Sequence, residues 1–91
     1  MVELKNYKNT KSEIFITAIK ERNEIQFLYK LKNILFHPYY ISKDKHGQKV
    51  LYGRVSNSQV VEKFEFRYMA NIKVLNNKKF SPIIPILSMV S

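Results

Sequence analysis

The sequence predicts a mainly β fold in which one N-terminal helix precedes a small five-stranded barrel of the SH3-like or Sm-like type. Two observations carry this prediction. A helix-start signal followed by an apolar stripe at helical spacing stands near the beginning of the 91-residue chain. The rest of the chain holds five short segments rich in β-formers, separated by polar turn sequences. Closely spaced short strands of this kind are typical of small barrels, and a chain of this length forms one domain.

The helix is predicted over residues 12–22. Thr10 and Glu13 match a capping box, in which the threonine caps the helix and the glutamate reaches back to the threonine amide. The apolar residues that follow at helical spacing are Ile14, Phe15, Ala18 and Ile19. Asn23 is the expected stop, and the apolar stripe of the helix must lie on another element.

The strands are predicted over residues 24–30, 34–42, 49–56, 60–68 and 71–75. Three residues within or between them carry specific expectations. Pro38 predicts an edge strand or a bulge, because proline cannot donate to a ladder. Gly47 is expected to take the left-handed position of a hairpin turn. Gly53, inside a strand, predicts a bend or a close approach of another backbone.

The fourth strand shows the clearest alternation of side chains. Val60, Phe64 and Phe66 are expected on one face, with Lys63, Glu65 and Arg67 on the other. The fifth strand is expected to stop at the polar run of residues 76–79, after which Phe80 anchors the end of the barrel.

Three regions are predicted: a basic lead-in over 1–11, the barrel over 12–80 and an apolar, proline-containing tail over 81–91. The tail holds Ile83, Ile84, Ile86 and Leu87, which are too many apolar residues to leave exposed. Either they cover the barrel of their own chain or they contact a second subunit, so a homo-oligomer formed through residues 81–91 is one expectation.

Composition narrows the class of protein. Sixteen lysines and arginines against seven acids give a net charge of +9, which favours polyanionic partners such as nucleic acid, nucleotides or an acidic protein. The alternative is that the chain is simply rich in lysine and that the positive charge serves no binding function. The chain has no cysteine, which excludes disulfides, thiolate metal sites and a cysteine nucleophile. With no signal-peptide or membrane-span pattern, we expect a cytoplasmic protein without a membrane partner.

The candidate ligand-binding residues combine planar cations with aromatic faces. Arginine offers a fork of donors that suits phosphate, and tyrosine offers a face on which a base can stack. The candidates are Arg54, Arg67, Tyr52, Tyr68, Lys49, Tyr39 and Lys63. The alternative is that the arginines are solvated strand residues or pair with Glu62 and Glu65.

Nothing in the sequence favours catalysis. His37 and His46 are the only histidines, and Asp44 is the only aspartate. Asp44 and His46 lie two residues apart in a predicted turn, which is poor preorganisation for acid–base chemistry. No metal-ligand spacing and no phosphate loop are present. We therefore expect a non-enzymatic protein without a metal or cofactor.

Four sequence blocks, in this order and spacing, match the pattern of a known domain family. They are "AIKERNEIQFLY" from Ala18, "HPYYI" from His37, "GQKVLYGRV" from Gly47 and "FEFRYMANIKVLNNKKF" from Phe64. On these blocks the chain from Ile14 to Phe80 resembles the WYL domain family. It departs from the family at the name-giving triplet, which reads Lys49, Val50 and Leu51 here, and at the arginine of the last block, where Tyr68 stands. The family's usual N-terminal helix-turn-helix has no counterpart, since one helix cannot form it.

The resemblance implies an isolated WYL-like domain with an Sm-like barrel. It also implies a ligand-sensing module that binds a nucleotide or single-stranded nucleic acid, in bacterial transcription regulation or phage defence. The alternative from another class is a homo-oligomerising interaction module that docks on an acidic partner.

Overall fold

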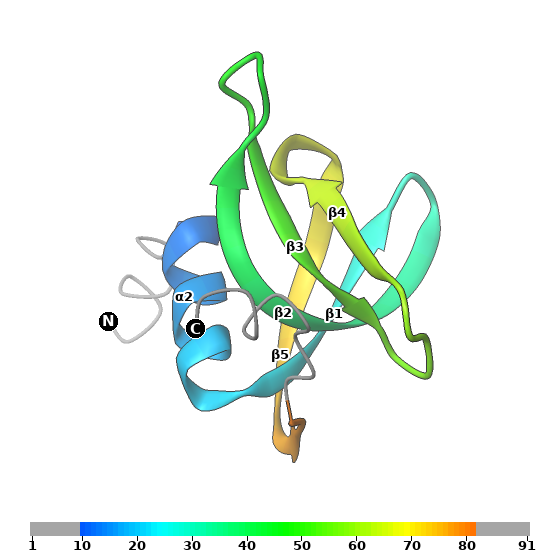
Figure 1. The fold of residues 1–91 in the computed structure, drawn as a ribbon. Coiled ribbons are helices and arrows are strands. Elements are labelled where there is room, and N and C mark those ends of the chain that lie inside the picture. Colours follow the sequence, from blue (N-terminus) through cyan, green and yellow to red (C-terminus); the bar gives the residue numbers. More distant parts are fainter. Residues whose placement is uncertain (1–9, 82–91) are drawn as a thin grey trace, which may run out of the picture.

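The computed structural model describes residues 10–81, which form one helix, five strands and a 3-10 turn (Figure 1). The elements are α2 (Lys11–Glu21), β1 (Asn23–Tyr29), β2 (Lys32–Lys43), β3 (Lys49–Val55), β4 (Val61–Glu65), η1 (Phe66–Tyr68) and β5 (Met69–Lys79). The predicted mainly β class is confirmed. Most of the predicted lead-in, residues 1–9, and most of the predicted tail, residues 82–91, lie outside the described residues.

The five strands form one antiparallel sheet in the order β4-β3-β2-β1-β5. The sheet curves into a barrel-like shape, and α2 packs mainly on β2 and β1 (Figure 1). β4 and β5 are the two edges, and within residues 10–81 no ladder joins them, so the barrel is not closed by strand pairing. The short η1 connects these two edges.

The predicted capping box begins the helix. The Thr10 amide donates to Glu13 Oε1 at 2.9 Å, and the Glu13 amide donates to Thr10 Oγ1 at 3.1 Å. The predicted stop at Asn23 is wrong by one residue: Arg22 takes the left-handed conformation at φ 58°. Asn23 instead begins β1 and is buried, because β1 pairs with β5 from its first residue.

The core is built around three phenylalanines of β1, β2 and β4. Phe27, Phe36 and Phe64 meet edge to face with ring centroids 5.1–5.7 Å apart, a favoured aromatic geometry. The helix contributes Phe15 and Ala18, both fully buried. Val60 does not share the face of Phe64 as predicted, because it precedes β4 and is 62% exposed.

The predicted fourth and fifth strands have different limits in the structure. Strand β4 ends at Glu65, and Phe66 to Tyr68 form η1 rather than extended chain. This turn lets the Phe66 ring reach Phe15 of the helix at 5.0 Å while the chain crosses to the other edge of the sheet. β5 then continues through the polar run 76–79, because β1 offers a partner as far as the Asn23–Lys79 pair.

The proline and glycine expectations explain how β2 and β3 fit together. Pro38 lies in an interior strand, at a bulge where the register shifts between Pro38 and Tyr40. Gly53 lies opposite Pro38, and a Cβ placed there would meet the His37 carbonyl oxygen at 2.2 Å. Gly47 has φ 80° in the β2–β3 turn, as predicted. The bulge and the close approach together determine which β2 side chains face outward.

Candidate binding surface

A row of three side chains crosses the outer face of β2, β3 and β4. Tyr40 pairs with Tyr52, and Tyr52 pairs with Lys63, in the antiparallel registers. The two tyrosine rings stack with centroids 4.8 Å apart and planes within 10°. Because strand side chains alternate, this row lies opposite the core residues Leu51 and Phe64. We call these three residues the Tyr40–Tyr52–Lys63 row.

Arg54 lies two residues beyond Tyr52 on the same face of β3. Its Nε donates to the Tyr39 hydroxyl at 3.0 Å, and its Nη1 donates to the Ser58 carbonyl oxygen at 2.5 Å. These bonds use two of the five donors of a guanidinium. They hold the guanidinium against the Tyr39 hydroxyl, so Arg54 and Tyr39, both predicted site residues, are in contact.

A histidine lies across the strand pair from Arg54. His37 Nε2 is 3.4 Å from Glu24 Oε2, and the ring stacks on Phe80 with centroids 4.5 Å apart. Burial lowers the pKa of His37; nearby Arg54 lowers it further, while Glu24 acts in the opposite direction. Burial therefore favours the neutral imidazole, and the buried Nδ1 has no hydrogen-bond partner within residues 10–81.

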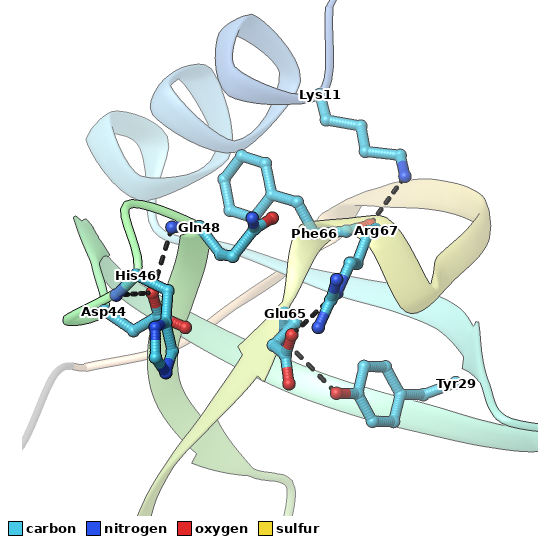
Figure 2. Close-up of polar contacts among 8 residues, drawn as sticks. All are labelled: Lys11, Tyr29, Asp44, His46, Gln48, Glu65, Phe66 and Arg67. Carbon is cyan, nitrogen blue, oxygen red and sulfur yellow. Dashed lines mark hydrogen bonds and ion pairs between the residues drawn. The ribbon is translucent and has the colours of Figure 1, made fainter.

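Two other predicted residues, Arg67 and Tyr68, belong to a separate cluster around η1. Arg67 Nε donates to Glu65 Oε1 at 2.9 Å, as Figure 2 shows, and this bond is the main reason that the pKa of Arg67 is raised. The Arg67 guanidinium lies 4.8 Å from the Tyr68 ring centroid, and Lys30 Nζ lies 4.6 Å from it. We call Lys30, Arg67 and Tyr68 the η1 cluster. The Tyr68 ring already contacts two cations, and such cation–π contacts are favourable without a ligand.

Lys49 lies in a third place. It precedes Leu51 on the core side of β3, and its Nζ donates to Ser12 Oγ of α2 at 3.1 Å. Its neighbours in the WYL-like triplet, Val50 and Leu51, are fully buried. Lys49 therefore lies at the junction of helix and sheet, beside a groove that Tyr40 also lines.

The seven predicted residues thus fall into three groups, and the structure places Tyr52, Lys63, Arg54 and Tyr39 together. Sequence reasoning omitted Tyr40 from the site, although Tyr40 directly follows the candidate Tyr39 in the block "HPYYI". The signal was the adjacent pair Tyr39–Tyr40, but only the bulge decides which ring stacks on Tyr52.

The β2–β3 turn binds its own aspartate. Asp44 accepts the amides of His46 at 2.8 Å and Gln48 at 2.9 Å, and Figure 2 shows both bonds. These bonds, above all the one from Gln48, lower the pKa of Asp44. Asp44 therefore serves as a turn residue that stabilises the hairpin tip.

Within residues 10–81, no group of three or more His, Cys, Asp or Glu side chains is placed to hold a metal ion. In the same range, no helix has the length and apolar character needed to cross a membrane. Comparison with protein-family profiles, curated proteins and solved structures finds no match to this chain.

Proposed function

We propose that the chain is a non-enzymatic binding module for a nucleotide or single-stranded nucleic acid. The observation that carries the proposal is the Tyr40–Tyr52–Lys63 row with Arg54 beside it. Tyr40 is 37% exposed, so its ring is accessible at the surface. A base stacks on a ring face of the tyrosine pair, while Lys63 and Arg54 bind phosphate.

Charge and resemblance support the same class of ligand. The net charge of +9 attracts polyanions over long range and raises the rate at which they associate. The resemblance to the WYL domain family favours a sensor or regulatory role in bacterial transcription or phage defence, in the cytoplasm. Both supports are weaker than the row itself, because neither points to particular side chains.

The test is fluorescence anisotropy of labelled single-stranded DNA and RNA, titrated with protein at low and near-physiological salt. Tyr52→Leu is expected to weaken binding by about 5- to 150-fold, since stacking contributes about 1–3 kcal/mol per base. Lys63→Gln is expected to weaken binding and to reduce the slope of log affinity against log salt by about 1. Lys73→Gln on β5 removes the same charge from an exposed position on the opposite edge strand, and should change binding less.

Three results would reject the assignment. If Tyr68→Leu abolishes binding while Tyr52→Leu does not, the site is the η1 cluster. If no oligonucleotide or free nucleotide binds at low salt, the chain is not a binding module of this class. Binding that Lys73→Gln weakens as much as Lys63→Gln would mean that net charge acts alone, without a site.

A further inference from the structure

An apolar groove separates α2 from β2, on the helix side of the sheet. It has a volume of about 420 Å³, which is within the size range of ligand pockets. Its apolar lining comes from Ile16, Ile19, Tyr39, Tyr40 and Ile41. Ile16 is 44% exposed, so the helix presents a branched aliphatic side chain to the groove without covering it. Among the described residues, the charged ones in the lining are Lys20 and Lys49, and none is an acid.

The described chain ends beside this groove. The Phe80 amide donates to the Arg22 carbonyl oxygen at 3.0 Å, which ties the end of β5 to the end of α2. The Phe80 ring also lies 6.0 Å from the ring of Tyr39, a groove residue. Phe80, at the end of the described chain, therefore lies next to one wall of the groove.

The sequence that follows has the composition to fill such a groove. Residues 82–91 read "PIIPILSMVS", with no charged residue and six large aliphatic or methionine side chains. The two prolines lack amide donors, so this segment needs fewer backbone hydrogen bonds when it leaves water. We propose that the groove between α2 and β2 is the docking site of this chain's own C-terminal segment, residues 82–91.

Chain geometry permits docking within one molecule. Ile84 follows Phe80 by four residues, a reach of up to about 13–14 Å. Ile16 precedes Arg22, the residue bonded to Phe80, by six residues, which is about 9 Å along the helix axis. Ile84 can therefore reach Ile16 without any movement of the described fold. The inference does not rest on the proposed function. Tyr40 belongs to both surfaces, so a docked segment and a stacked base would compete for its ring.

The chain has no cysteine. A pair of engineered cysteines therefore reports contact between two chosen positions without interference from native thiols. Ile16→Cys with Ile84→Cys tests the groove. Thr17→Cys with Ile84→Cys is the matched control, because Thr17 is exposed and faces the other cleft, between α2 and β5. At a micromolar protein concentration under mild oxidation, the cysteine pair at 16 and 84 is expected to form a disulfide within one chain. It should do so at least tenfold faster than the pair at 17 and 84. Non-reducing electrophoresis and mass spectrometry distinguish closure within a chain from closure between chains.

Three outcomes would overturn the proposal: equal rates for the two pairs, no disulfide in either, or a disulfide that forms mainly between two chains. The last outcome would assign the groove to the tail of a second copy. As an independent measurement, deletion of residues 82–91 from an otherwise complete chain should raise the fluorescence of an apolar dye several-fold, and Ile16→Lys in the deleted chain should reverse the rise. Unchanged dye fluorescence in a deleted chain with a native circular dichroism spectrum would also overturn it.

Discussion

Gly53→Ala is expected to destabilise the fold more than any other glycine change in this chain. Gly53 lies in β3 opposite Pro38, where β2 bulges. An added Cβ would lie 2.2 Å from the His37 carbonyl oxygen and 2.6 Å from the Phe36 ring. Neither neighbour can turn aside, because one is backbone and the other is a fully buried ring of the aromatic core.

The magnitude follows from the displacement required. The added Cβ would need to lie about 1 Å farther from the His37 carbonyl oxygen to make an ordinary van der Waals contact. The two strands β2 and β3 must therefore separate locally. Overpacking of a well-packed core costs about 1–3 kcal/mol, and a clash with backbone stands at the upper end of that range. For a chain of this size, whose total stability is about 5–14 kcal/mol, a loss of about 3 kcal/mol lowers Tm by about 12–24 °C.

The assay is thermal and urea unfolding followed by circular dichroism, with Gly47→Ala as the matched control. Gly47 has nothing within 4 Å of an added Cβ, but its φ of 80° strains alanine. That strain costs about 1–2 kcal/mol. The Tm of Gly53→Ala should therefore fall further than that of Gly47→Ala. An equal or smaller fall would refute the close approach of β2 and β3, and with it the bulge that positions Tyr40.

Three further predictions concern the helix cap, the buried histidine and the first hairpin. Thr10→Ala removes the side-chain cap and should cost about 1 kcal/mol, measured by urea unfolding, whereas Thr10→Ser should be nearly neutral. The folded pKa of His37 lies below its ordinary 6.5, so the unfolded chain binds more protons as pH falls through 6.5. The unfolding free energy should then decrease below that pH, and His37→Gln should flatten this part of the profile. Leu31 is 92% exposed with φ 74°, so Leu31→Gly should raise Tm by relieving the turn; a lower Tm would contradict this explanation.

Much of the fold could be predicted because its signals are local. The capping box and the left-handed turn at Gly47 each depend on neighbouring residues, and the structure contains both. The limits of β4 and β5 could not be predicted in the same way. They depend on the contact of Phe66 with Phe15 and on the partner that β1 offers, and both involve residues far apart in the chain.

The candidate site was predictable in its residue types but not in its grouping. Tyrosine next to arginine in a strand identifies useful chemistry, and Arg54 and Tyr52 do lie on one surface. Arg67 and Tyr68 have the same local pattern, yet they contact Glu65 and Lys30 in a separate cluster. Sequence spacing cannot separate these cases, because both pairs follow alternating stretches.

The sequence by itself determined the class of fold, since periodicity and turn chemistry act over a few residues. It also determined the charge and the absence of thiol chemistry, since both are matters of composition. The tertiary structure alone decided which aromatic and basic side chains meet. The bulge at Pro38 and the approach of Gly53 set the register of β2 on β3, and this register turns Tyr40 onto Tyr52 beside Lys63. Register is a relation between strands, so a one-residue difference would have moved each side chain to the other face.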